Sequence, residues 1–72
     1  MFIRCGVCLT SPLICFATDD IDICVCKYED KSLEIVCSLK VQDYINAIAC
    51  FGDNIIVCGD KAGNLATYKL ID

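Results

Sequence analysis

Apolar residues lie along the chain in short runs, and the positions between the runs are held by residues that favour turns. Thr10-Ser11-Pro12 ends the first run, and Gly52-Asp53-Asn54 ends a later run of the same length. Proline, glycine, aspartate and asparagine supply the backbone angles that a tight reversal needs. No segment shows the spacing of an amphipathic helix, so the pattern predicts strands throughout. The expected strands are residues 2–9, 13–17, 22–28, 33–41, 44–51, 55–59 and 64–70.

The apolar pattern differs between strands and predicts how each one is covered. Residues 13–17 and 55–59 are continuous apolar runs, as in strands that are buried on both faces. Residues 33–41 instead alternate apolar with mostly polar positions, as in an outer strand with one face in solvent. We therefore expect the apolar positions from Leu33 to Val41 to share one face of the sheet.

The chain repeats itself at a spacing of 42 residues, since residues 2–30 align with residues 44–72 without a gap. Apolar runs fall on apolar runs and turn residues on turn residues, with Cys8 on Cys50. A repeat of about 40–45 residues with four strands is typical of a β-propeller blade. We therefore expect two units: a four-stranded blade at 1–43 and a three-stranded partial blade at 44–72.

The second unit resembles the WD-repeat family in the order of its strands and turns. Residues 44–60 are similar to the first two strands of that family and residues 61–69 to its third, with Tyr68 where the signature tryptophan stands. In the first unit, Asp20 holds the place of the family's turn aspartate and Cys26 the place of its tryptophan. The resemblance implies an all-β fold built from antiparallel, four-stranded propeller blades.

The chain departs from this family at the diagnostic residues. It contains no tryptophan and no histidine, Val41 lies at the histidine position, and Lys27 and Lys69 stand where the family has aspartate. The hydrogen-bond network that the family builds from histidine, serine, aspartate and tryptophan is therefore not expected here.

Propellers of this family hold partner proteins on the loops of one rim, so the resemblance implies a non-catalytic protein-interaction scaffold. The expected partners are other proteins, the remainder of a propeller, or further copies of the chain. Tyr44 is the expected centre of binding, because aromatic side chains supply much of the binding energy at interfaces. The expected rim residues are Asp19, Asp20, Gln42, Asp43, Tyr44 and Lys61.

Charge and composition argue against several other classes of function. The net charge is −4, and no cluster of lysine and arginine is present that could bind the phosphates of a nucleic acid. Without histidine, the chain cannot form a histidine-based catalytic pair or a mixed cysteine–histidine zinc site. We find no nucleophile–base pair and no phosphate-binding loop, so we expect no enzyme. The longest uncharged stretch, residues 5–18, is too short and too interrupted to span a bilayer, so we expect no membrane partner.

Eight cysteines are the most unusual feature of the composition. Cys5-x-x-Cys8 and Cys24-x-Cys26 offer four thiolates for a zinc ion. However, strand residues three apart point to opposite faces, and Cys8 aligns with a cysteine of another inner strand, where cysteine packs as a small apolar residue. A redox pair usually opens a helix, and no helix start lies near Cys5. We therefore expect free thiols, no metal and no cofactor.

A small secreted or metal-stapled cysteine-rich protein is the alternative. Residues 4–17 resemble a signal peptide that is cleaved after Ala17. Cleavage would leave five cysteines, an odd number for paired disulfides. We expect instead a cytoplasmic protein, with the nucleus as the other open compartment. Eight alkylated thiols in a mass spectrum would support a reduced protein, whereas paired cysteines, bound zinc or cleavage would support the alternative.

The chain carries more apolar residues than its size lets it bury. Of its 72 residues, 57% are apolar, and a chain of this length buries only about 60–65% of its surface on folding. No fourth strand follows residues 64–70, and an open strand edge invites pairing with another strand. We expect the C-terminal part of a longer propeller, with a fragment of arbitrary ends as the alternative, and association with other copies or with the rest of a propeller.

Overall fold

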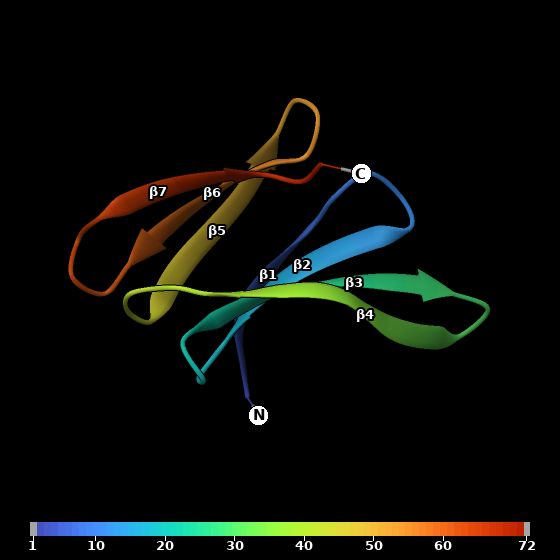
Figure 1. Ribbon diagram of the computed structural model, residues 1–72, viewed down its shortest axis with the longest axis horizontal. Coiled ribbons are helices and arrows are strands. Elements are labelled where there is room, and N and C mark those ends of the chain that lie inside the picture. Colours follow the sequence, from blue (N-terminus) through green and yellow to red (C-terminus); the bar gives the residue numbers. More distant parts are fainter. Residues whose placement is uncertain (1, 72) are drawn as a thin grey trace.

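A computed structural model describes residues 2–71 and shows seven strands in two antiparallel sheets (Figure 1). The first sheet holds β1 to β4 in chain order, the second holds β5 to β7, and no described residue is helical. The predicted all-β fold is confirmed, and every strand lies within one residue of its expected ends. The strands are β1 (Ile3–Cys8), β2 (Leu13–Thr18), β3 (Asp22–Glu29), β4 (Ser32–Lys40), β5 (Ile45–Phe51), β6 (Ile55–Asp60) and β7 (Leu65–Lys69).

The two sheets share one pairing register at the 42-residue spacing. Each first strand carries a bulge between its first and third residues, in β1 and again in β5. The amide of Asp19 donates to the carbonyl of Phe2 at 3.0 Å, and the amide of Lys61 donates to the carbonyl of Tyr44 at 2.8 Å. These two hydrogen bonds join residues that are equivalent in the repeat. Residues 2–29 and 44–71 therefore have the same local fold.

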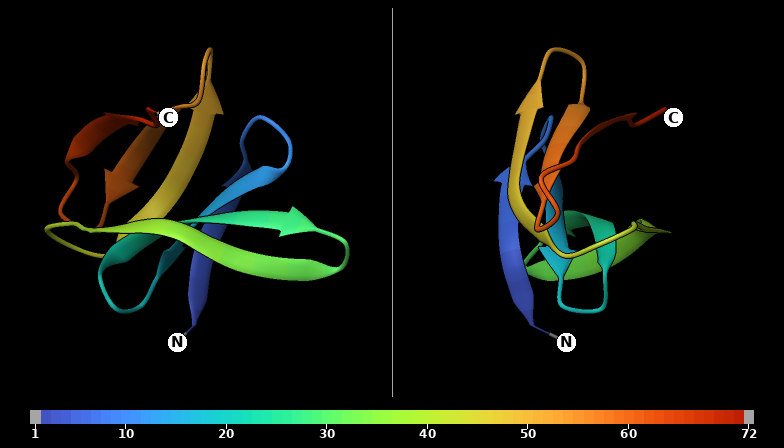
Figure 2. Two further views of the ribbon diagram at one scale, coloured as in Figure 1. Left: turned by 45° about the vertical axis from the view of Figure 1, so that its right-hand side comes forward. Right: turned by 90° about the vertical axis from the view of Figure 1, so that its left-hand side faces the viewer.

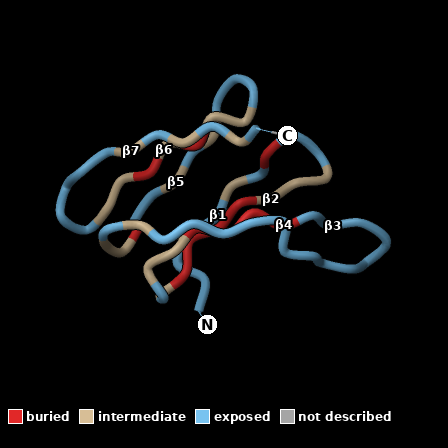
Figure 3. The backbone as a smooth tube through the Cα atoms, in the orientation of Figure 1, coloured by how far each residue is buried: buried red, intermediate tan, exposed pale blue. Residues whose placement is uncertain are grey.

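The sheets pack face to face along β1 and β5 and diverge toward their last strands. The backbones of β1 and β5 are close neighbours, whereas those of β4 and β7 are not in contact. The distance between the two sheets therefore increases from their first strands to their last (Figures 1 and 2). The faces by which the two sheets contact each other are called the inner faces. The buried positions in Figure 3 lie mainly on these faces and in β2 and β3. The residues buried between the sheets are Leu9, Cys15, Ala17, Ile23 and Val25 from the first sheet and Ile45, Ile56 and Cys58 from the second.

The two continuous apolar runs are covered differently. In β2, Cys15 on the inner face and Phe16 on the opposite face are both buried, as predicted. In β6, Ile56 and Cys58 are buried on the inner face, but Val57 between them is only half-buried. The prediction of burial on both faces therefore holds for β2 and not for β6, because residues 2–71 form no buried cluster on the other face of the second sheet.

The expected alternation of β4 is wrong, because a bulge interrupts the strand. Cys37 lies opposite Val25, but Ile35 lies opposite Cys26, on the other face. An extra residue in one strand moves all later side chains to the opposite face. The apolar residues of β4 are thus divided between the two faces, and every residue of the strand is exposed.

Candidate protein-interaction rim

Three loops lie at one end of the molecule, at the left and lower left of Figure 1. They join β2 to β3, β4 to β5, and β6 to β7. The ammonium group of Lys40 donates to the carbonyl of Asp20 at 3.0 Å, and the amide of Lys61 donates to the carbonyl of Tyr44. The middle loop is thereby tied to both of its neighbours. We call this end the rim; it consists of residues 19–21, 41–44 and 61–64 and contains all six residues predicted from the sequence.

Two of the predicted acidic residues fold the rim through their carboxylates. The carboxylate of Asp19 accepts the amide of Phe2 at 2.9 Å, and the carboxylate of Asp43 accepts the amide of Tyr44 at 2.7 Å. Both bonds fix the backbone just before a first strand. The side chain of Lys61 is exposed, so it is free to contact another molecule.

Arg4 is a rim contact that the sequence analysis missed. Its Nε donates to the carbonyl of Ile45 at 3.1 Å, and its Nη2 donates to Oδ1 of Asn46 at 2.8 Å. Its guanidinium carbon lies 4.9 Å from the centre of the Tyr44 ring, a cation–π contact. Arg4 therefore ties β1 to β5 and covers one face of the tyrosine. The signal was present, because Arg4 and Asn46 align in the repeat and aligned residues of stacked units are neighbours.

Polar pairs close the β2–β3 and β6–β7 hairpins at equivalent positions. The buried Thr18 hydroxyl donates to the carboxylate of Asp22. The amide of Asn64 donates to the carboxylate of Asp60 at 2.9 Å. Asp20, also predicted as a rim residue, donates its amide to the Thr18 hydroxyl at 3.1 Å. These local pairs brace the hairpins in a chain without the tryptophan-centred network of the family.

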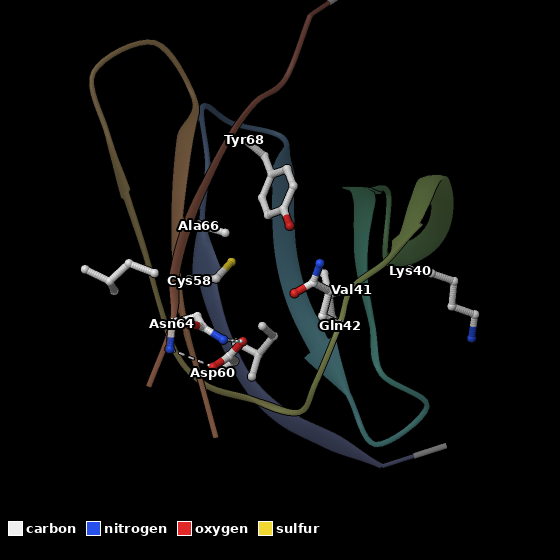
Figure 4. Close-up of a pocket in the computed structure, with 10 residues that line it drawn as sticks. Lys40, Val41, Gln42, Cys58, Asp60, Asn64, Ala66 and Tyr68 are labelled. Carbon is white, nitrogen blue, oxygen red and sulfur yellow. Dashed lines mark hydrogen bonds between the residues drawn. The ribbon is translucent and has the colours of Figure 1, made fainter. Parts of the chain in front are cut away.

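A groove of about 320 Å³ opens beside the rim, between the second sheet and the β4–β5 loop (Figure 4). Tyr68 and the predicted residue Gln42 point into it from opposite walls, while the side chain of Lys40 points away. Asp60 and Asn64 make its rim end polar. Because its walls come from two separate segments, residues 40–45 and 58–68, only the folded chain shows it. Within the described residues, β7 pairs with β6 alone, so its other edge lies open beside the groove.

Both sheets also expose an apolar face on the side away from the other sheet; we call these the outer faces. On the first sheet, Phe16, Cys24 and Cys26 are already buried on this face, and its exposed part lies along β1, where Ile3 is 61% exposed and Cys8 is also exposed. On the second sheet, residues that alternate with the buried ones point outward. They include Phe51, which is 55% exposed, and Leu65, which is 79% exposed.

The cysteines are all unpaired and are spread over both sheets. Cys5 packs against the core between the sheets and Cys8 is exposed, so the two lie on opposite faces as expected. The expectation that Cys8 packs in the core is wrong, because Cys8 points outward from β1, where the outer face of the first sheet is exposed. Burial raises the pKa of the Cys15 thiol from 9.0 to about 12, and it also raises the pKa of Cys58. In residues 2–71, no three cysteine or acidic side chains gather as a metal site requires.

Comparison with known proteins gives no relative from which to transfer a function. No family model matches the chain, and no curated protein and no solved structure matches it. The resemblance to WD repeats therefore stays a prediction. No helix among the described residues is long and apolar enough to cross a membrane.

Proposed function

We propose that the chain is a non-catalytic protein-interaction module, formed by a four-stranded blade and an adjacent three-stranded partial blade of a WD-repeat-like propeller. The observation that carries the proposal is the stacking of two sheets of equal register that leaves apolar residues exposed on both outer faces, among them Ile3, Phe51 and Leu65. Soluble monomers rarely expose large contiguous apolar patches, and such patches mark interaction sites. A blade in the middle of a propeller has this character on both faces, because a neighbour covers each one.

The rim is the proposed site for a partner of another kind. Loops held by a rigid sheet are common binding elements, and here three loops are tied together by hydrogen bonds. Tyr44 offers an aromatic ring that Arg4 holds in place, and Lys61 offers an exposed charge beside it. Gln42 offers an amide at the mouth of the groove. A ring held in one orientation loses less conformational entropy on binding than a free one.

The cytoplasm, or the nucleus, is the proposed compartment. Eight unpaired thiols support a reducing environment, since disulfides persist mainly in oxidising compartments. In this proposal the cysteines serve as small apolar residues, as Cys15 and Cys58 do between the sheets.

Photo-crosslinking in cells tests the rim. The photoreactive amino acid p-benzoylphenylalanine replaces Tyr44 in one variant and Asp53, in the β5–β6 turn outside the rim, in the control. We expect crosslinks from position 44 to a discrete partner protein that position 53 does not capture. Circular dichroism of both variants shows whether the strands are intact. If two folded variants give the same crosslinks, or none, the rim is not a binding site.

A further inference from the structure

We propose that copies of this chain stack head to tail, with the outer face of the second sheet of one copy on the outer face of the first sheet of the next. The proposal rests on how the faces of the two sheets correspond in the repeat. At the 42-residue spacing, the outer face of the second sheet corresponds to the inner face of the first. The outer face of the first sheet corresponds in turn to the inner face of the second.

The outer face of the second sheet carries side chains like those that the first sheet already buries. Phe51 is equivalent to Leu9, and Leu65 is equivalent to Ile23. Leu9 and Ile23 are only 8% and 4% exposed, because they pack in the core between the sheets. Phe51 and Leu65 are large apolar residues at the same places of an identical register. A surface that can pack like the first sheet is therefore present and open.

The outer face of the first sheet is the matching counterpart. Ile14 and Phe16 are equivalent to Ile56 and Cys58, which are buried on the inner face of the second sheet. Phe16, Cys24 and Cys26 are buried within the chain itself, so the open part of this face is the strip along β1 that carries Ile3, Gly6 and Cys8. Ile14, Phe16, Cys24 and Cys26 are uncharged, and so are the residues that correspond to them in the second sheet.

A shallow hollow of about 300 Å³ lies on the outer face of the first sheet. Gly6 lines it, and the equivalent residue of the second sheet is the bulkier Ile48. The face that would dock there carries Phe51 where the first sheet has the smaller Leu9. The hollow thus offers room for the larger ring. The occupant that fits it is a second copy of the chain. The second sheet of that copy would pack on the first sheet of this one as the two sheets of one chain already pack on each other.

The contact joins two different faces, so each copy keeps one face of each kind for a further neighbour. Such contacts form closed rings where the rotation allows it, and open filaments otherwise. Propellers close with about four to eight blades, so two to four copies of this two-sheet chain would complete a ring. This inference rests on the proposed function only in requiring protein to cover the outer faces; it makes no use of the rim.

Analytical ultracentrifugation of the whole chain tests the stacking. Leu65→Lys places a charge on the outer face of the second sheet, and Ile3→Lys places one on that of the first. Leu39→Lys is the matched control, because Leu39 is also an exposed apolar residue but faces the space between the sheets. We expect oligomers of the wild type and of the control, and single chains of each face variant.

Mixing the two face variants separates head-to-tail stacking from other association. Each variant keeps the face that the other has lost, so an equimolar mixture should form pairs and no larger species. A wild-type chain that stays monomeric at high micromolar concentration would overturn the inference. So would folded face variants that still assemble alone, or a mixture that remains monomeric. A monomeric wild type that still crosslinks a partner through position 44 would leave the proposed function intact.

Discussion

Ile21 and Gly63 occupy the same place in the two repeats, in the turn that follows the second strand. Their φ angles are +57° and +90°, in the left-handed region. Glycine adopts this region freely, whereas a side chain there costs roughly 1–2 kcal/mol, and a β-branched residue is a clear outlier. The β2–β3 turn of the first sheet therefore carries backbone strain that the β6–β7 turn avoids.

Gly63→Ala should lower the free energy of unfolding by about 1 kcal/mol, since alanine disfavours a positive φ. No atom lies within 4 Å of the Cβ that the substitution adds, so the backbone conformation is the only cause. Gly59→Ala is the control. Its added Cβ would lie at an ordinary 3.7 Å from Leu65, and its φ is outside the left-handed region. Equal losses in urea denaturation of the two variants would contradict this explanation.

The buried thiols predict a loss of stability at alkaline pH. Burial raises the pKa of Cys15 from 9.0 to about 12 and raises the pKa of Cys24, Cys26 and Cys58 in the same direction. Between pH 9.0 and about 12 the folded chain therefore binds more protons than the unfolded chain. The free energy of unfolding must fall as the pH rises through this window, and it is unaffected by these groups below it.

Urea denaturation at a series of pH values measures this loss. The comparison is with Cys15→Ala, in which one buried thiol is removed and the decline above pH 9.0 should be shallower. Slopes are compared rather than absolute values, because the substitution also removes packing. A wild type with constant stability across the window would show that the thiols do not ionise on unfolding.

At the scale of the strands, the sequence was sufficient because turn residues mark every boundary. Asn54 and Gly52 both adopt a positive φ in the β5–β6 turn, which fits the type of residue found there. The bulge in β4 was missed, because its mark in the sequence is only the apolar Val36 between Ile35 and Cys37, with no glycine beside it. The groove beside Tyr68 was also missed, because its width depends on the distance between the second sheet and the β4–β5 loop, which the sequence pattern does not give.

The two faces of β6 predict different responses to the same substitution. Ile56 is buried between the sheets, whereas its neighbour Ile55 points to the outer face and is half-buried. Ile56→Val should lower the free energy of unfolding by about 1 kcal/mol, the usual loss for one buried methylene. Ile55→Val should lower it less, in urea denaturation of dilute protein. A larger loss at Ile55 would mean that the outer face is covered even in dilute solution.

At the scale of the whole molecule, the open surfaces matter more than the core. The chain folds around a thin layer of side chains between two sheets and a small second cluster on the first sheet, and each outer face still leaves apolar residues in solvent, such as Ile3 and Leu65. A binding partner that contacts only the folded state stabilises it by mass action. Stability should therefore depend on whatever covers the outer faces.

The thermal midpoint of the wild type should rise with protein concentration, because assembly favours the folded state. The midpoint of Leu65→Lys should be independent of concentration, since this variant lacks one of the two docking faces. Differential scanning calorimetry over a range of concentrations provides the measurement. A wild-type midpoint that does not change with concentration would contradict assembly through these faces.

The shared register of the two sheets has a consequence for how such a chain evolves. Each unit offers the same pair of complementary surfaces. A duplicated stretch of 42 residues would therefore find a complementary surface on the unit before it. An array of this kind can gain or lose units without inventing a new interface.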